Sequence, residues 1–560
     1  MTFATSFLFL ASALFSDVRI WQVSDRQVVV DYRVEDAPVD IEVHFFTNGV
    51  EVADASCWED DSDRRRINKP GKYRTVWYAD SLLDDERTWD VSASATLVAR
   101  RKGMKDSVVR TETIELGGNG VFLGGVPVSG FRGIWYGNEP SHDEYAFKYS
   151  GGLGTYCEGH LPMGVYSSAA ERTFFCWGGA SDASSSSLFH CIASYDHRRK
   201  RLSAPVAVLD KRTTDAHDNP VIALDDGGYV WMFSSSHGRL RRSYISRSVR
   251  PNDISRFRLV KETNFSYPQP HFIPGEGFLF LHTWYSGGRR VGYSLMDRDG
   301  GTLAPRKPLI FMDKGSYIRS WRQGRKVGVA FDRHPIVEGT QPLNRRTDLY
   351  YMQSDDFGRT WRNAAGEIIQ VPVTNSVNPA LVRRYDLGGD SRRNVYVKGV
   401  RFTPKGMPVI LYILSRGHRS GPGDGPREWW IAAWNGNAWD VKDTSIRSDS
   451  NYDFGFLDFG REDGRWRIVA ATGKGPQPFN PGGEIECWSS EDGGNVWTKD
   501  RSVTSSSVRN HSYPRHPVDA HPDFFAFWAD GDGRKLSRSC LYYCDSSMNV
   551  FKMPYEENDK

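Results

Sequence analysis

Hydrophobic and polar residues alternate along four stretches of the first hundred residues. These stretches are residues 18–23, 27–34, 39–46 and 89–99. Alternation with a period of two places the hydrophobic side chains on one face of a β-strand. The pattern therefore predicts a small β-sandwich over residues 17–120, with a size and strand number that suit an accessory or spacing module.

Beyond a glycine-rich boundary at residues 117–120, a hydrophobic strand, a tight turn and an aromatic strand recur along the chain. The recurrences are about 50 residues apart, which is the size of a four-stranded propeller blade. They fall at residues 154–177, 217–236, 267–284, 317–331, 395–414, 452–471 and 511–528. The sequence thus predicts an all-β protein in which residues 121–560 form a seven-bladed β-propeller.

The composition agrees with this prediction. Aromatic residues make up 13% of the chain, which also contains 54 Gly and 28 Pro. Aromatic strands separated by Gly and Pro turns are typical of all-β proteins. A chain of 560 residues is also too long for one ordinary core, so two or more domains are expected.

Two short motifs support the propeller. Ser354-Asp-Asp-Phe-Gly-Arg-Thr-Trp361 and Ser490-Glu-Asp-Gly-Gly-Asn-Val-Trp497 both fit the pattern S-x-D-x-G-x-x-W. This pattern resembles the Asp-box of bacterial-neuraminidase-repeat proteins. We expect the aspartates, Asp356 and Asp492, to accept backbone N–H bonds in outer turns while the tryptophans pack against the blade. The motif marks a fold and not an active site.

One stretch brings two histidines into register. His217 and His237 each lie ten residues from Gly227, inside the turn sequence Asp-Asp-Gly-Gly. In a regular hairpin, residues equidistant from the turn face each other, so the two imidazoles are expected to lie roughly 5 Å apart. Such a pair could transfer protons near neutral pH. A structural histidine pair closing the hairpin is the alternative.

The innermost strands of a propeller begin at one rim of its central channel. Residues that open the predicted units therefore converge there, and they are Tyr156, His217, Tyr267, Tyr317, Tyr452, and His511 with Tyr513, while the fifth unit has no clear counterpart. Aromatic faces flanked by hydrogen-bonding groups suit sugar rings. His334, Arg345 and Arg515 lie near the same rim, where an arginine could pair with a substrate carboxylate or sulfate. Each arginine alone could equally form a structural ion pair.

Charge and cysteine content exclude several classes of function. The chain has 72 basic and 69 acidic residues and a net charge of +3, which indicates neither nucleic acid nor a membrane surface as partner. Seven scattered cysteines form no Cys-x-x-Cys pair, so no zinc knuckle or disulfide framework is evident. Phosphate-loop and G-x-S-x-G motifs are absent from the sequence. No cofactor is required by these patterns, although a structural calcium or zinc ion would be compatible with them.

Residues 2–15 form an apolar run that is too short to span a bilayer. The run predicts a signal peptide over residues 1–16 and hence a secreted or periplasmic protein. The oligomeric state is left open by the sequence.

Several motifs carry a family resemblance. They are Lys148-Tyr-Ser-Gly-Gly-Leu-Gly-Thr-Tyr156, His217-Asp-Asn-Pro220, Ser236-His-Gly238, Tyr267-Pro-Gln-Pro270 and Gly475-Pro-Gln-Pro478. Through them residues 121–560 resemble the bacterial-neuraminidase-repeat propellers, and more remotely the seven-bladed ulvan lyases and rhamnose–glucuronate lyases. Those enzymes cleave a bond to a uronic acid by β-elimination. The resemblance implies an anionic polysaccharide, sulfated or not, as substrate.

The same resemblance implies roles for individual residues. His217 matches a base or shared acid/base, His237 a donor facing the substrate carboxylate, and Tyr267 the second proton-transfer group. The sequence departs from the ulvan lyases at residues 280–284, where they place an arginine and this chain has Phe-Leu-His-Thr-Trp. His282, Arg289 or an arginine of another blade could substitute for it.

Two other functions fit the predicted scaffold. A glycoside hydrolase, sialidase-like or rhamnosidase-like, would use the same channel mouth, and Arg132 in Gly130-Phe-Arg-Gly133 is a hint of an N-terminal sialidase arginine. The third possibility is a glycan-binding propeller without catalytic activity.

Overall fold

The structure is a computed structural model with many antiparallel sheets and little helix. It describes residues 14–22, 27–52, 65–78, 91–116, 120–135, 144–145, 151–180, 187–238, 241–285, 288–337, 345–385, 393–460 and 464–556. Contacts divide the chain into two compact units. Unit 1 comprises Met1–Asn119 with His237–Arg242, and unit 2 comprises Gly120–Ser236 with Ser243–Lys560.

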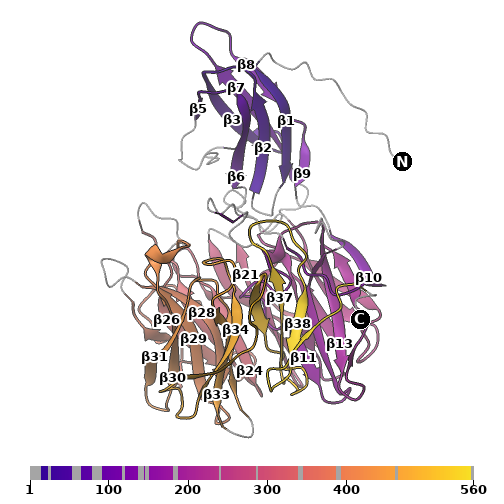
Figure 1. The fold of residues 1–560 in the computed structure, drawn as a ribbon, viewed down its shortest axis with the longest axis vertical. Helices are drawn as coiled ribbons and strands as arrows, with labels where there is room; N and C mark the ends of the chain where they lie inside the picture. Colours follow the sequence, from indigo (N-terminus) through magenta and orange to yellow (C-terminus); the bar gives the residue numbers. More distant parts are fainter. Residues whose placement is uncertain are drawn as a thin grey trace. The chain divides into compact units, whose positions relative to one another are not determined.

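Unit 1 is built from two antiparallel sheets (Figure 1). One joins β1 (Phe15–Gln22), β2 (Gln27–Val34) and β6 (Gly71–Tyr78). The other joins β4 (Val50–Glu51), β3 (Val39–Thr47), β7 (Val91–Arg100) and β8 (Ser107–Arg110), with β5 (Arg65–Ile67) on β3 and β9 (Ile114–Leu116) on β7. Buried and half-buried residues alternate along β7, and side chains from both sheets share one core. The four predicted strands are thus confirmed as strands.

Unit 2 contains seven antiparallel sheets in its described residues. The first has the order β10 (Val121–Pro127), β15 (Val206–Asp210), β13 (Leu188–Asp196), β12 (Arg172–Ala180) and β11 (Gly164–Ser167), with β14 (Arg201–Leu202) on β13. The second is β16 (Pro220–Leu224), β17 (Val230–Ser234), β18 (Ser243–Ser248) and β19 (Phe257–Thr263). The third is β20 (Ser266–Ile273), β21 (Gly277–Tyr285), β22 (Arg289–Met296) and β23 (Thr302–Ile310).

The remaining four sheets follow the same up-and-down order. The fourth is β24 (Ile318–Gln323), β25 (Lys326–Arg333), β26 (Thr347–Ser354) and β27 (Leu381–Arg383), and the fifth is β28 (Asn394–Phe402), β29 (Pro408–Ser415), β30 (Arg427–Trp434) and β31 (Trp439–Ser448). The sixth is β32 (Gly455–Phe459), β33 (Trp466–Gly473), β34 (Glu484–Ser490) and β35 (Thr498–Ser502). The seventh is β36 (Asn510–Arg515), β37 (Ala526–Gly531), β38 (Leu541–Cys544) and β39 (Val550–Lys552).

The first strands of neighbouring sheets contact one another in chain order, from β11 to β36. Val165 of β11 also pairs in parallel with Val518, just after β36, so the last sheet lies against the first. In Figure 1, β37 and β38 accordingly lie beside β11 and β13. Bulky side chains such as Phe175, Phe524 and Phe527 fill the core at this junction.

The recurring hairpins predicted from the sequence correspond to the first two strands of each sheet, with one exception. The first prediction began a strand at residue 154, whereas β11 begins at Gly164. Residues 154–163 were therefore wrongly assigned. Pro162 cannot donate a ladder hydrogen bond, and the polar groups of this segment bind other strands, as described below.

Both Asp-box predictions are confirmed. Asp356 Oδ1 accepts from the backbone N–H of Thr360 at 2.9 Å, and Trp361 is fully buried against Tyr293. Asp492 Oδ1 likewise accepts from the N–H of Val496 at 3.0 Å. These hydrogen bonds hold the pKa of both carboxyl groups below their usual range despite some desolvation.

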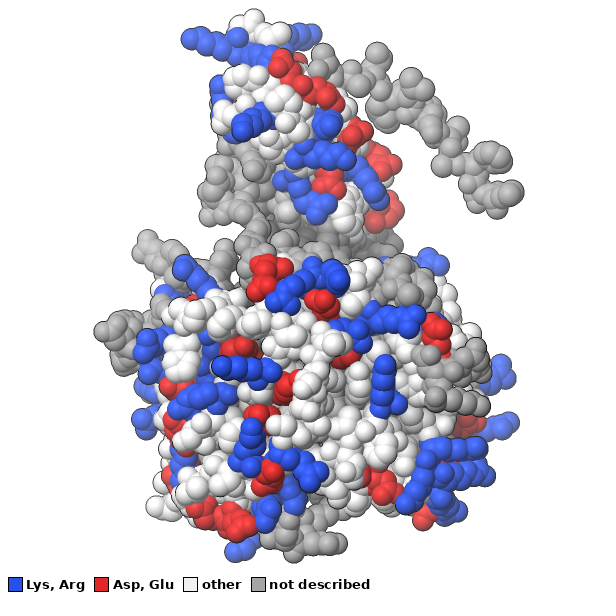
Figure 2. Space-filling view, viewed as in Figure 1, with Lys and Arg blue, Asp and Glu red and all other residues white. Residues whose placement is uncertain are grey.

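Basic and acidic side chains are interspersed over the face shown in Figure 2, as the nearly balanced composition predicts. Among the described residues, no helix is long and apolar enough to cross a membrane. The cysteines within the described ranges are buried thiols. The predicted signal peptide lies almost entirely outside the described residues.

Candidate functional site

One chain segment, residues 155–162, binds the first strands of several unit 2 sheets, and we call it the central segment. Arg515 of β36 donates to three of its carbonyl oxygens: Nε to Thr155 at 2.7 Å, Nη1 to His160 at 3.2 Å and Nη2 to Cys157 at 2.5 Å. The Arg515 guanidinium is buried and lies over the ring of Phe454. The structure therefore uses Arg515 to hold the backbone, and its donors do not face a ligand.

A buried carboxylate connects the central segment to two further strands. Glu158 accepts from Arg319 Nη2 of β24 at 2.8 Å and from Lys398 Nζ of β28 at 2.6 Å. Gln269 of β20 donates to the Gly159 carbonyl at 3.1 Å. Charges removed from water are tolerated when they are paired in this way. The segment thus joins strands that are far apart in the sequence.

The central segment contributes Tyr156 to an array of hydrogen-bonded side chains. The Tyr156 hydroxyl lies 2.5 Å from His217 Nε2, and His217 Nδ1 lies 2.7 Å from Asp215 Oδ1. All three residues are buried. Because a carboxylate oxygen accepts and does not donate, Nδ1 carries the ring proton, and the Nε2 lone pair faces the hydroxyl of Tyr156.

Local structure fixes this array. Asp215 caps the short 3-10 helix Ala216–Asp218, and its Oδ1 also accepts from the backbone N–H of His217 at 3.0 Å. Aspartate is a preferred residue at such a position because its side chain satisfies a free amide. The same oxygen thereby sets both the backbone and the ring of His217.

The predicted histidine pair is brought together. The ladder of β16 and β17 ends with the pair Pro220 and Ser234, and His217 lies just before it in the 3-10 helix Ala216–Asp218. Single ligand atoms of Asp215, His217 and His237 lie within 4.8 Å of one another.

Two tyrosines reach the same region through irregular strands. Tyr267 of β20 and Tyr513 of β36 have positive φ angles of 49° and 53°, each at a register shift. A β-bulge re-aims a side chain in this way. The Tyr513 ring packs edge-on against Tyr156 at 5.1 Å, and Tyr156, Tyr267 and Tyr513 belong to one buried cluster.

Tyr267 packs against a further tyrosine and lies near an arginine. Its ring lies 5.5 Å from that of Tyr317, and the Arg289 guanidinium lies 5.3 Å from the Tyr317 ring. Burial raises the pKa of Tyr267 well above its ordinary value, the rings of Tyr285 and Tyr317 add to this, and the charge of Arg289 acts in the opposite direction. Arg289 was among the predicted candidates for the charge-neutralising role.

A second buried arginine is enclosed by tyrosine rings. The Arg346 guanidinium lies 4.7 Å from the ring of Tyr317, 4.6 Å from that of Tyr396 and 5.5 Å from that of Tyr452. Its Nη2 donates to the Tyr452 hydroxyl at 3.3 Å. Cation–π contacts of this kind keep an arginine charged inside a protein. Tyr317 therefore contacts both Arg289 and Arg346. Arg345, which precedes Arg346 in the chain, is only half-buried.

Three predicted histidines have structural partners. His282 lies 3.1 Å from Ser294 Oγ in the neighbouring strand and packs against Phe280, and burial lowers its pKa well below the usual range. His511 binds Trp528 Nε1 and Ser507 Oγ through its two ring nitrogens. His334 is fully buried, 4.9 Å from the Tyr317 ring and 3.4 Å from Asp332, and burial lowers its pKa. Of these three histidines, only His334 contacts Tyr317, the tyrosine that also contacts Arg289 and Arg346.

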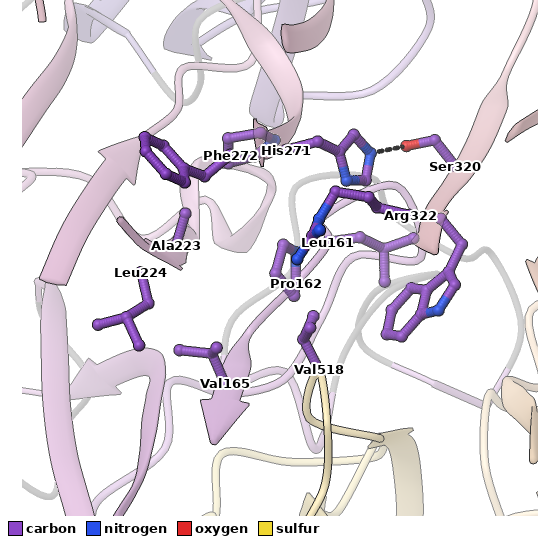
Figure 3. Close-up of a pocket in the computed structure, with 12 residues that line it drawn as sticks. Leu161, Pro162, Val165, Ala223, Leu224, His271, Phe272, Ser320, Arg322 and Val518 are labelled. Atoms are coloured by element: carbon purple, nitrogen blue, oxygen red, sulfur yellow. Dashed lines mark hydrogen bonds between the residues drawn. The ribbon is translucent and has the colours of Figure 1, made fainter. Parts of the chain in front are cut away.

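A pocket lies between four of the first strands (Figure 3). It is lined by residues of β11, β16, β20 and β24, together with Leu161, Pro162 and Val518. His271 and Ser320 face each other across it and are hydrogen-bonded at 2.7 Å. Burial lowers the pKa of His271 to about 3, so this imidazole is neutral. The lining is largely apolar and contains none of Tyr156, Tyr267 and Tyr513.

Sequence reasoning missed Asp215 and the central segment. The spacing Asp215-Ala-His217 is itself a signal, because an aspartate two residues before a histidine can cap a turn and bind the ring at once. The repeated Ser-Tyr-Pro at residues 266–268 and 512–514 is a second signal, since it marks both tyrosine bulges. Glu158 gave no such signal, because its partners lie 161 and 240 residues away.

Comparison with known proteins agrees with this arrangement. A family model described as "BNR repeat-containing family member" matches residues 173–447. An ulvan lyase of Pseudoalteromonas sp. (strain PLSV) is 24% identical over 377 residues, which are 59% of this chain and 74% of that protein. An ulvan lyase of Nonlabens ulvanivorans is 22% identical over 411 residues, 62% of this chain and 82% of that protein. The chain resembles the ulvan lyases.

The fold agrees as well. A solved ulvan lyase structure of the PL25 polysaccharide lyases superposes with a TM-score of 0.58 and 18% identity, covering 72% of this chain and 96% of that one. A PL25 ulvan lyase bound to -[GlcA(1-4)Rha3S]- gives a TM-score of 0.57 over the same shares of the two chains. This likeness establishes the ulvan lyase fold, and with the sequence relatives it supports a polysaccharide lyase family.

Proposed function

We propose that unit 2 is a seven-bladed β-propeller that cleaves the glycosidic bond to a uronic acid by β-elimination. The substrate is an anionic polysaccharide, sulfated or not, such as ulvan or another rhamnose and glucuronate glycan. The protein acts as a secreted or periplasmic enzyme, and unit 1 is a β-sandwich accessory domain. Seven sheets whose first strands contact one another in order, with the last sheet against the first, support the propeller.

The observation that carries the proposal is the array of Asp215, His217 and Tyr156 next to the bulged tyrosines. Its two hydrogen bonds of 2.7 and 2.5 Å link a carboxylate, an imidazole and a phenol. Such a chain activates the phenol as a base, because its proton can pass to an imidazole that the carboxylate keeps oriented and stabilises when charged. Elimination requires a base of this kind.

The reaction proceeds with balanced bonds and protons. The Tyr156 oxygen takes the C5 proton of the uronate while its own proton passes to His217 Nε2. The electron pair of the C5–H bond forms the C4–C5 double bond, and the C4–O bond breaks. Tyr267 protonates the departing oxygen, since its raised pKa keeps it protonated near neutral pH. The products are a new reducing end and an unsaturated uronate.

Negative charge builds on the uronate carboxylate when C5 loses its proton, so a cation or donor must stabilise it. Arg289 fits this role because its guanidinium stacks on Tyr317, which packs against Tyr267. His237, close to His217, is the second donor in the proposal. Arg289 thereby takes the place of the arginine that the sequence lacks at residues 280–284.

The substrate class rests on the relatives and on the composition of the site. The similar proteins are named ulvan lyases, and one related structure holds a glucuronate and sulfated rhamnose disaccharide unit. Tyrosine faces with two buried arginines suit a sugar that carries acidic groups. Glu158, the carboxylate in the central segment, has both oxygens occupied by cations, which disfavours it as the acid of a hydrolase.

The experiment is incubation of the full chain with a panel of uronate polysaccharides that includes ulvan. Unsaturated uronate is followed by its ultraviolet absorbance, and new reducing ends are counted in parallel. We expect both signals to rise together with at least one polymer, and His217→Ala to abolish them. His44→Ala is the matched control, because His44 is a partly exposed histidine of β3 that pairs with Glu51.

Other outcomes are equally informative. Reducing ends without the ultraviolet signal would show a hydrolase and refute the lyase. Binding without either product would show a glycan-binding protein. An unchanged rate in His217→Ala would refute the assignment of the array.

A further inference from the structure

A cluster of two histidines and one aspartate lies apart from the proposed active site, in the part of unit 2 where the first and last sheets meet. His197 directly follows β13 of the first sheet, and His521 and Asp523 lie between β36 and β37 of the last sheet. One ligand atom from each lies within 4.8 Å of the others. We propose that these three residues bind a divalent transition metal ion, with Zn²⁺ as the best fit, and that the ion fastens the last sheet to the first.

The donor atoms are in the required state and place. His197 Nε2 lies 2.9 Å from Thr173 Oγ1, which leaves Nδ1 on the side of the cluster. That Nδ1 is buried, has no hydrogen-bond partner and lies 3.8 Å from Asp523 Oδ2. A buried nitrogen without a partner is costly unless a ligand uses its lone pair.

The second histidine offers a lone pair as well. His521 Nδ1 accepts from the backbone N–H of Asp523 at 3.1 Å, so this nitrogen carries no proton, and a bound metal would replace that hydrogen bond. It lies 3.9 Å from Asp523 Oδ2. The imidazole rings of His197 and His521 have their centroids 3.8 Å apart, an arrangement that favours neutral rings because two imidazolium ions would repel each other. Neutral imidazole is the form that binds metal.

The distances and the donor set indicate the kind of metal. A four-coordinate Zn²⁺ with bonds of about 2.0–2.2 Å holds its ligand atoms roughly 3.3–3.5 Å apart. The separations of 3.8 and 3.9 Å need to shorten by only a few tenths of an ångström. Imidazole nitrogen suits zinc, copper and nickel, whereas calcium prefers oxygen ligands. His521 and Asp523 keep about a third of their side-chain surface exposed, which leaves room for entry and for a water ligand.

The position gives the ion a structural role. The backbone already joins the two sheets here, since Val518 donates to Gly164 at 2.9 Å and Tyr166 donates to Val518 at 2.9 Å. The Tyr166 ring contacts both histidines, at 5.3 and 5.1 Å. A metal that binds the folded chain and not the unfolded one stabilises the folded state. It would therefore resist separation of the first and last sheets.

The test uses the full chain after removal of metal with a chelator. Zn²⁺ binding is measured by isothermal titration calorimetry, Tm by circular dichroism, and Co²⁺ binding by its visible absorption. We expect excess Zn²⁺ to raise the Tm of unit 2 by a few degrees and Ca²⁺ to leave it unchanged. His521→Ala and Asp523→Asn should each lose one equivalent of bound Zn²⁺, the Tm increase and the Co²⁺ spectrum.

Two controls make the result specific. His44→Ala removes a partly exposed histidine of unit 1, and His217→Ala removes a histidine of the other cluster; both should keep the Zn²⁺-dependent rise in Tm. If His521→Ala does not fold, the nearly isosteric Asp523→Asn decides. Wild-type protein without a Tm shift, or variants with an unchanged shift and stoichiometry, would overturn the proposal. These readouts are independent of catalysis and of the proposed lyase activity.

Discussion

At the residue scale, the chemistry of the site depends on the bond between His217 and Asp215. This bond fixes which nitrogen of the imidazole carries the proton, and it does so in a buried environment where hydrogen bonds are stronger than in water. Without the carboxylate, the ring could adopt the other tautomer and present an N–H to Tyr156. The phenol would then have no acceptor for its proton.

Asp215→Asn tests this dependence. We expect kcat to fall by roughly 10²–10⁴-fold with little change in KM, because the amide stabilises the wrong tautomer and leaves the fold intact. The measurement is the ultraviolet assay under saturating substrate. Asp226→Asn, at a half-exposed aspartate in the turn between β16 and β17, is the matched control and should keep full activity. Equal rates for the two variants would contradict the assigned role.

At the scale of the strands, the bulges in β20 and β36 decide where two tyrosines point. Each bulge inserts a residue with a positive φ angle into a strand that otherwise pairs regularly. The central segment then packs against one of these tyrosines, through Gly159 beside Tyr267. A Cβ atom at position 159 would lie 2.9 Å from Cδ1 of Tyr267, so only glycine allows residue 159 to pack against this ring.

Gly159→Ala should therefore displace Tyr267 and lower kcat by roughly 10- to 100-fold, since small misplacements of a catalytic group are costly. The three atoms nearest to the added methyl group all belong to Tyr267, so the Tm should change much less than the rate. Gly423→Ala is the control, because a Cβ there meets nothing within 4 Å. A variant with wild-type kcat would show that the position of Tyr267 is not critical.

The ion cluster of the central segment acts on stability. Glu158→Gln leaves Lys398 and Arg319 buried with a weaker partner, and we expect unfolding free energy to fall by about 3–5 kcal/mol. Denaturant unfolding followed by tryptophan fluorescence measures the change. Glu276 also binds two cations, Arg325 and Arg359, but at a more exposed site, so Glu276→Gln should cost far less stability. Similar losses for both variants would contradict the special status of the buried cluster.

At the scale of the whole chain, periodic features were predicted well from the sequence and singular ones were not. The recurring hairpins and the two Asp-boxes follow from residue spacing, because strands and turns are local structures. The histidine pair was found for the same reason, since its partners lie on one hairpin. The bond between Tyr156 and His217 spans 61 residues, and no local pattern reports such a contact.

The strand misassigned at residues 154–163 shows the physical limit clearly. Its sequence has the glycines and aromatic residues of the other units, yet its backbone is bound by side chains of distant strands. Likewise Arg515 has the position expected of a ligand-binding residue, but three carbonyl groups occupy its donors. Which partner a polar group finds is a property of the assembled chain.

The central segment has one further consequence for a polymer substrate. Residues 155–162 are bound by β20, β24, β28 and β36, so one segment joins the first strands of four unit 2 sheets. In the proposed lyase, a long polysaccharide would therefore bind across this segment and not pass through it. That arrangement favours a separate encounter for each cut over processive sliding.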